Sequence, residues 1–176
     1  EICKNIHNIL LAFKEIFSNN QELKDKCIVS IVGSGSLEKD YREYADSLDL
    51  SNNVEFLGFL PEEDLENVYE QSHLLLYLPY NEPLGLVPID AALRGVPAIV
   101  SDHGGPTETV VNNKTGYWVN PGSVKDIADK IKYAAQNRVE LETMGREAFE
   151  YAIEKFWVGD VANYLEKIFP KRNEND

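Results

Sequence analysis

Residues 73–90 read HLLLYLPYNEPLGLVPID: a continuous apolar run, a loop from Pro79 to Leu84 and a second apolar segment. A continuous apolar run is typical of a strand that is covered on both faces, as the strands of parallel sheets are. The second segment favours a helix that extends to about Arg94. A strand that leads through a loop into a helix is the repeating unit of α/β proteins, so this stretch predicts that fold class.

The same alternation of strands and helices continues along the rest of the chain. Apolar residues at helical spacing predict an N-terminal helix from Ile6 to Phe17. Short apolar or β-branched runs predict the other strands, at 27–32, 54–57, 97–100 and 116–119. Further helices are expected at 37–48, from Pro61, from Pro106 and over about 123–169, the last interrupted near 138 and 157. This order predicts a doubly wound parallel sheet of the Rossmann-like kind.

One domain accounts for the length of the chain. Its 176 residues are 43% hydrophobic, which is enough to build a core without disulfides or metals. We expect one domain over residues 1–170 and a charged, frayed tail over residues 171–176. Because Glu1 leads almost directly into the first helix, we also expect the chain to be a piece of a longer protein whose first strand precedes it.

The charge of the chain excludes some classes of partner. Thirty acidic residues oppose 17 basic ones, for a formal net charge of −13. Because phosphate contacts need a basic surface, this balance argues against nucleic acid as a partner and against docking on an anionic membrane. No apolar stretch approaches the roughly 18 residues of a membrane-spanning helix. Cys27 reads as a small core residue, which fits a reducing, cytoplasmic compartment.

In open α/β sheets, ligands bind beyond the carboxyl ends of the strands, so the loops there are candidate sites. The first is the loop with Gly33 and Gly35. It lacks the Gly-Lys-Ser/Thr of a phosphate-binding P-loop, and Glu38 stands where a dinucleotide fingerprint has its third glycine. The two glycines fit equally a tight strand-to-helix turn and a close approach of the backbone to a ligand.

The loop that follows residues 73–78 is the most informative. A helix that begins there presents the free N–H groups of Gly85, Leu86 and Val87, which suit an anion. Glu82 and Asp90 flank them, and carboxylates accept hydrogen bonds from hydroxyls. This combination points to a phosphorylated, hydroxyl-rich ligand such as a sugar nucleotide. The simpler alternative is that both carboxylates are solvated surface charges, and the residues taken alone favour it.

The third loop, residues 102–108, again delivers the start of a helix. Glu108 in the first turn fits a favourable interaction with the helix dipole. His103 is an exposed loop residue or, less often in such loops, a hydrogen-bonding group near a phosphate. The sequence contains no Asp-x-Asp motif and no cluster with metal-ligand spacing, so we expect no metal site.

Several stretches of the sequence, taken in their order along the chain, resemble glycosyltransferase family 4. The resemblance is specifically to the C-terminal, donor-nucleotide-binding, Rossmann-like domain of its two-domain GT-B enzymes. The resemblance covers nearly the whole chain. The stretches that carry it are Val32-Gly-Ser-Gly35, Asn53-Val-Glu-Phe-Leu-Gly58, Glu82-Pro-Leu-Gly-Leu-Val-Pro-Ile-Asp90, Gly95-Val-Pro-Ala-Ile-Val-Ser-Asp102, Gly104-Gly-Pro-Thr-Glu108 and Gly116-Tyr-Trp-Val-Asn-Pro121.

The resemblance implies a role for each candidate residue. Glu82 would bind hydroxyls of the donor sugar, and Asp90, where the family has Glu, would hold the ribose. The N–H groups of residues 85–87 would receive the diphosphate, and Lys4 would neutralise it together with an Arg that lies upstream of Glu1. The remaining implied contacts to the nucleotide come from Gly33, Gly35 and the Phe59 region, which would border the base.

The resemblance implies a retaining, metal-independent glycosyltransferase that needs no cofactor beyond its nucleotide-diphosphate sugar. Glu82 and Lys4 would serve catalysis, and a missing N-terminal GT-B domain would carry the acceptor site. We therefore expect this chain alone to be inactive, and the protein to be cytoplasmic or held at the cytoplasmic face of a membrane by that domain. Three alternatives stay open: a non-catalytic nucleotide-sugar-binding module, a GT-B relative such as a sugar-nucleotide epimerase or a phosphorylase, and an unrelated doubly wound nucleotide or flavin domain, which the incomplete glycine fingerprints disfavour.

Overall fold

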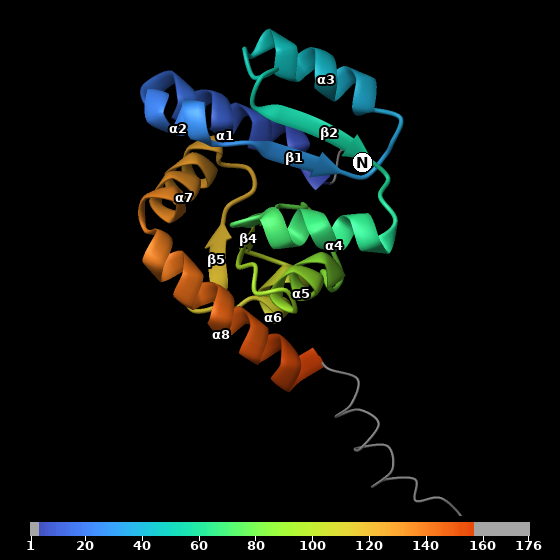
Figure 1. Cartoon of the computed structure of the whole chain (residues 1–176), viewed down its shortest axis with the longest axis vertical. Helices are drawn as coiled ribbons and strands as arrows, with labels where there is room; N and C mark the ends of the chain where they lie inside the picture. Colours follow the sequence, from blue (N-terminus) through green and yellow to red (C-terminus); the bar gives the residue numbers. More distant parts are fainter. Residues whose placement is uncertain (1–3, 157–176) are drawn as a thin grey trace, which may run out of the picture.

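The computed structural model describes residues 4–156, in which short strands alternate with helices along the chain (Figure 1). The strands are β1 (Val29–Val32), β2 (Val54–Gly58), β3 (Leu75–Tyr77), β4 (Ala98–Ser101) and β5 (Gly116–Val119). The helices are α1 (Ile6–Asn19), α2 (Gln21–Lys26), α3 (Glu38–Ser47), α4 (Glu62–Gln71), α5 (Leu86–Ala92), α6 (Pro106–Thr109), α7 (Val124–Gln136) and α8 (Arg138–Phe156).

The strands pair in parallel, as expected, but they form two sheets rather than one. In the described residues β1 pairs with β2, and β3 and β5 both pair with β4. The single continuous sheet that we expected is therefore not seen, because β1 and β3 are not hydrogen-bonded to each other. In the first sheet β2 lies beside β1, and in the second sheet β4 and then β5 follow β3, so strand order runs away from β1 in one sheet and away from β3 in the other. Doubly wound folds bind ligands beyond the carboxyl ends of the strands from which the order runs outward, so the loops after β1 and β3 are the ones to inspect.

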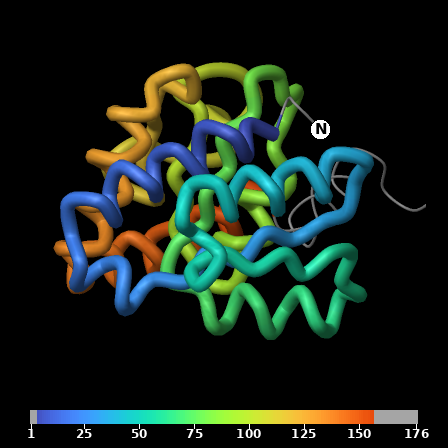
Figure 2. The backbone as a smooth tube through the Cα atoms, turned by 90° about the horizontal axis from the view of Figure 1, so that it is seen from above, coloured from blue at the N-terminus to red at the C-terminus, as the bar shows by residue number. Residues whose placement is uncertain are grey.

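Helices cover both faces of the three-stranded sheet, so this part of the fold is doubly wound. Ile99, Tyr117 and Val119 join the main core cluster, in which they meet residues of α1 and α7. The alternate residues Ala98 and Val100 pack on the other side, with Val110 beyond the end of α6. Successive side chains of a strand point to opposite faces, which explains this partition. Figure 2 shows α1 lying between α3 and α7, and it contacts both helices.

Two predicted strands are shorter in the structure than in the sequence prediction. The strand expected at residues 27–32 begins at Val29, because helix α2 occupies residues 21–26. We did not predict α2: its sequence has no apolar periodicity, and Asn20 starts it by accepting a hydrogen bond from the Leu23 N–H at 3.0 Å. The strand expected at 73–78 is restricted to Leu75–Tyr77. Its residues are only half-buried rather than covered on both faces, because β3 is an edge strand in the described sheet.

The remaining predictions of elements agree closely with the structure. Helix α5 ends at Ala92, two residues before the expected Arg94, and the long C-terminal helical region is divided at Asn137 into α7 and α8. The expected interruption at Trp157 and the tail at 171–176 lie outside the described residues. Among residues 4–156, no helix is both long and apolar enough to cross a membrane.

Candidate functional site

The loops that follow β3 and β4 pack against each other at the carboxyl ends of these strands. The N–H of Gly105 donates to the carbonyl oxygen of Glu82 at 2.8 Å. A Cβ at position 105 would lie 2.3 Å from the backbone of Leu84, so only glycine allows this approach. The backbone around Glu82 is therefore held by the neighbouring loop.

Glu82, Lys4 and Tyr77 form a compact polar cluster beside this contact. The Lys4 Nζ lies 2.9 Å from Glu82 Oε2 and 3.2 Å from the Tyr77 hydroxyl oxygen. The Tyr77 hydroxyl donates to the same carboxylate oxygen at 2.7 Å, and the Lys4 Nζ lies 5.2 Å from the centroid of its ring. The structure thus brings together Lys4 and Glu82, which lie 78 positions apart in the sequence and which the resemblance assigned to catalysis.

The charges in this cluster stabilise each other. Hydrogen bonds from Tyr77 and then from Lys4 hold the pKa of Glu82 below its ordinary value. Burial works to lower the pKa of Lys4, but its bonds to Glu82 and Tyr77 outweigh that effect and raise it. Burial, followed by the bond to Glu82, raises the pKa of Tyr77. At neutral pH the cluster therefore holds an ammonium, a carboxylate and a neutral phenol.

Helix α5 begins at Leu86, next to this cluster, and confirms the predicted strand-to-helix junction. Gly85 precedes it with φ +84°, and no side chain caps the first turn. The side chain of Leu86 is 65% exposed. The first N–H groups of α5 are thus not satisfied by a capping side chain, as the expected anion-binding role of residues 85–87 requires.

Asp90 lies on α5 with its side chain exposed, beside the partly buried side chain of Arg94. Partial desolvation raises the pKa of its carboxyl against the attraction of Arg94, and Glu62 raises it further. The guanidinium of Arg94 donates to the Asp90 backbone carbonyl at 3.0 Å and forms an ion pair with Glu66 at 2.8 Å. The carboxylate of Asp90 is therefore accessible to a ligand hydroxyl.

The other predicted residues gather at the carboxyl ends of β1 and β2. The N–H of Gly33 donates to the carbonyl oxygen of Gly58 at 2.7 Å, which places the Gly33 turn beside the residue that precedes Phe59. Gly33 has φ +112° and no heavy atom within 4 Å of the place of a Cβ, so the turn conformation, and not crowding, explains the glycine. The carbonyl of Gly35 accepts from the Glu38 N–H at 3.1 Å. The Phe59 side chain is 79% exposed and thus free to border a ligand.

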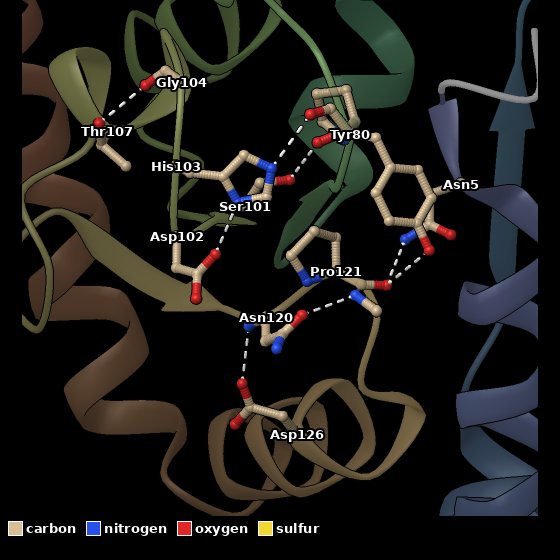
Figure 3. A network of polar contacts seen from close by, with 12 residues as sticks. Asn5, Tyr80, Ser101, Asp102, His103, Gly104, Thr107, Asn120, Pro121 and Asp126 are labelled. Atoms are coloured by element: carbon tan, nitrogen blue, oxygen red, sulfur yellow. Dashed lines mark hydrogen bonds and ion pairs between the residues drawn. The ribbon is translucent and has the colours of Figure 1, made fainter.

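The loop after β4 contributes a histidine whose two ring nitrogens both have partners. His103 Nδ1 lies 2.8 Å from Asp102 Oδ1, and Nε2 lies 3.0 Å from the carbonyl oxygen of Tyr80 (Figure 3). The first bond and then the second raise the pKa of His103 above its ordinary value. The sequence favoured a merely exposed His103; its side chain is half exposed, but it also joins two loops of the site. Glu108 stands in the first turn of α6, as predicted.

Sequence reasoning missed several residues that support the site. Tyr77 was read as an apolar strand residue, and only its position at the carboxyl end of the predicted strand could have indicated its polar role. A second group ties α1 to the loop after β5: Asn5 and Asn8 both donate to the carbonyl oxygen of Pro121, at 2.7 and 2.9 Å. Figure 3 shows Asn5 and Tyr80 directed toward Pro121. In the part of the chain that the structure describes, no three His, Cys, Asp or Glu side chains are grouped to hold a metal ion.

Comparison with known proteins supports the assignment of this fold. The chain is 36% identical over 135 residues to the alpha-1,3/1,6-mannosyltransferase alg-2 of Neurospora crassa, an alignment that covers 74% of this chain and 28% of that protein. It therefore spans well under half of that relative. Among solved structures, Anabaena Alr3699/HepE in complex with UDP and glucose has a TM-score of 0.79 at 23% identity, covering 96% of this chain and 45% of that one.

A second solved structure matches this chain over most of both lengths. It is the C-terminal domain of LpcC, a glycosyl transferase group 1 family protein from Francisella tularensis, with a TM-score of 0.78 at 16% identity. The match covers 90% of this chain and 82% of that one. These likenesses establish the Rossmann-like α/β fold of GT-B proteins. Because the family model for glycosyl transferases group 1 also matches residues 1–151, the chain belongs to that family.

Proposed function

We propose that this chain is the donor-binding domain of a family 4 glycosyltransferase, which moves a sugar from a nucleoside-diphosphate sugar to an acceptor hydroxyl. The observation that carries the proposal is the contact of Lys4 with Glu82 at 2.9 Å, beside the uncapped first turn of α5. An ammonium and free N–H groups suit a diphosphate, and an ionised carboxylate suits sugar hydroxyls.

In this proposal each part of the site binds one part of the donor. The N–H groups of residues 85–87 and the ammonium of Lys4 bind the diphosphate, and they stabilise its added negative charge as it leaves. Glu82 orients the sugar through its hydroxyls, without forming a covalent bond to it. Asp90 accepts from the ribose, and Phe59 borders the base near the Gly33 and Gly35 turn.

The reaction needs parts that we place in another domain. The acceptor hydroxyl is the nucleophile, and an N-terminal GT-B domain would hold it. Transfer with retention at the anomeric carbon and without a metal ion is part of the same proposal. A cytoplasmic location, or one at the cytoplasmic face of a membrane, fits the nucleotide-sugar donor. Because the Neurospora relative is named as a mannosyltransferase, a nucleoside-diphosphate mannose is the first donor to test.

The test is a titration of the 176-residue chain with UDP, GDP and ADP, followed by amide NMR shifts. We expect one nucleotide to shift the amides of residues 33–35, 58–60 and 84–90 selectively. Lys4→Ala should weaken binding at least tenfold, because it removes charge next to the diphosphate. The matched control is Lys26→Ala, which removes an exposed ion pair with Glu22 on α2 and should bind like the parent.

Transfer itself is tested in a polypeptide that also carries the acceptor-binding half. Glu82→Ala should sharply lower transfer while the fold stays intact. Equal transfer by Glu82→Ala and the parent contradicts the role of Glu82. Donor binding without any transfer would instead support a non-catalytic binding module. Epimerase turnover would support a sugar-nucleotide epimerase.

A further inference from the structure

Tyr77 holds the carboxylate of Glu82 from a rigid element. It is the last residue of β3, where it is paired in register with Val100 of β4. Its hydroxyl donates to Glu82 Oε2 at 2.7 Å, shorter than the 2.9 Å between that oxygen and the Lys4 Nζ. Both contacts fall on Oε2, which leaves Oε1 for another partner. A carboxylate fixed at one oxygen presents the other in a constant direction.

The two partners of Oε2 differ in how firmly they are held. The side chain of Lys4 is 48% exposed, on a long and flexible stem ahead of α1. In the proposed function, the same ammonium also binds the donor diphosphate, which carries more negative charge than Glu82. Lys4 therefore has two competing anions. The phenol of Tyr77 is half-buried on a strand and carries no charge, so a diphosphate attracts it less than it attracts the ammonium.

We propose that Tyr77 is the positioning residue that keeps Glu82 in place when Lys4 turns from the carboxylate to the diphosphate of the donor. This inference rests on the proposed function. Before the donor binds, Lys4 and Tyr77 share Oε2. After it binds, the phenol alone supplies the hydrogen bond, and Glu82 Oε1 accepts from a hydroxyl of the sugar. Tyr77 does not touch the reacting atoms; it acts through Glu82.

The first experiment compares Tyr77→Phe with Tyr133→Phe in a polypeptide that carries both halves of the enzyme. Tyr133 is a matched control, because its hydroxyl donates to Glu140 Oε2 at 2.8 Å on the exposed surface of α7 and α8. We expect Tyr77→Phe to lower kcat about 10- to 100-fold, the range for a lost hydrogen bond to a charged group. The KM for the donor should change by no more than about twofold, because Lys4 and α5 remain.

The pH profile separates positioning from a merely structural role. Tyr77→Phe removes the bond that lowers the pKa of Glu82 most, so the acid limb of kcat should move to higher pH. The groups that face the Glu82 carboxylate in the described residues are Lys4 and Tyr77, and Lys4 is unchanged in this variant. The Tyr133→Phe variant should keep the profile of the parent. Equal kcat in the two variants, or a loss carried by KM alone, overturns the inference.

The second experiment does not depend on activity. Carbon-detected NMR of the 176-residue chain follows the titration of the Glu82 carboxyl in Lys4→Met and in Lys4→Met combined with Tyr77→Phe. We expect the pKa of Glu82 to be higher in the double variant than in Lys4→Met, because the phenol of Tyr77 stabilises the carboxylate even when the ammonium is absent. Equal values would show that Tyr77 acts only through Lys4, which overturns the inference even if transfer is observed. Absence of transfer by the parent with every donor would instead overturn the proposed function, and the positioning role with it.

Discussion

The imidazole of His103 lies 3.0 Å from the backbone carbonyl oxygen of Tyr80, so that the loop after β4 is bonded directly to the loop after β3. The other ring nitrogen lies 2.8 Å from Asp102 Oδ1. A carbonyl and a carboxylate only accept hydrogen bonds, so both ring nitrogens must carry protons for both bonds to form. The contact therefore favours the imidazolium form.

This contact predicts that loop packing weakens as the pH rises. The pKa of His103 is raised in the folded chain, by the bond to Asp102 first and then by the bond to the Tyr80 carbonyl. A histidine whose pKa is raised on folding stabilises the folded chain at pH values below its pKa in the unfolded chain, which is about 6.5. This contribution is lost as the pH rises through its pKa in the folded chain. Denaturant unfolding at several pH values should show His103→Gln less stable than the parent at acid pH, by a small amount because the site is exposed.

The control for this effect is His7→Gln, since His7 stacks on Tyr44 with ring centroids 4.4 Å apart and its Nε2 lies 3.3 Å from the hydroxyl oxygen of that tyrosine. The difference between parent and His103→Gln should vanish above the folded pKa of His103. A difference that grows with pH would contradict the assignment of the imidazolium.

Ser101, the last residue of β4, ties the start of the loop after β4 to the loop after β3. Its hydroxyl is fully buried and donates to the Pro79 carbonyl oxygen at 2.6 Å. Ser101→Ala leaves that carbonyl without this donor, so we expect a loss of about 1–3 kcal/mol in the free energy of unfolding. Ser18→Ala removes an exposed hydroxyl bond to the Lys14 carbonyl at 2.8 Å and should change stability little. Equal effects in chemical denaturation would show that burial does not decide the cost.

Gly105 provides a test of the close approach between the two loops. A Cβ there would meet the Leu84 backbone at 2.3 Å, and backbone atoms cannot move aside cheaply. Gly105→Ala should destabilise the chain by about 1–3 kcal/mol and shift the amides around Glu82. At Gly122 the nearest atom to a new Cβ is the Asn120 side-chain oxygen at 3.2 Å, so Gly122→Ala is the matched control. If both variants unfold alike, the two loops are not as close as described.

Asp90 tests the ribose contact of the proposed function. Asp90→Glu lengthens the side chain by one methylene and restores the residue type of the family, so nucleotide binding should be preserved or tightened. Calorimetric titration with the preferred nucleotide measures the change. The control is Asp129→Glu, an exposed partner of Lys125 on α7. A large loss of affinity confined to Asp90→Glu would show that Asp90 does not hold the ribose.

Local sequence patterns were enough to predict the alternation of strands and helices, apart from helix α2, and the loop that carries the site. A continuous apolar run, a loop and a second apolar segment over residues 73–90 are local features, and they were enough to predict β3, the start of α5 and the place of Glu82. Helix α2 was missed because a side-chain cap at Asn20, not an apolar face, marks its beginning. Both signals come from residues that are neighbours in the sequence. A strong apolar pattern can be recognised there, whereas a single capping residue is easily overlooked.

Which distant residues meet, and how they are charged, depends on the packing of the whole chain. Lys4 and Tyr77 reach the same oxygen of Glu82 from 78 and 5 positions away, and no local pattern encodes that convergence. Likewise the division of the strands into two sheets depends on which backbone edges form hydrogen bonds, and β1 and β3 do not. Apolar periodicity reports which face of an element is buried. It does not report the partner across a loop, because hydrogen bonds between loops depend on distances that only the packed chain sets.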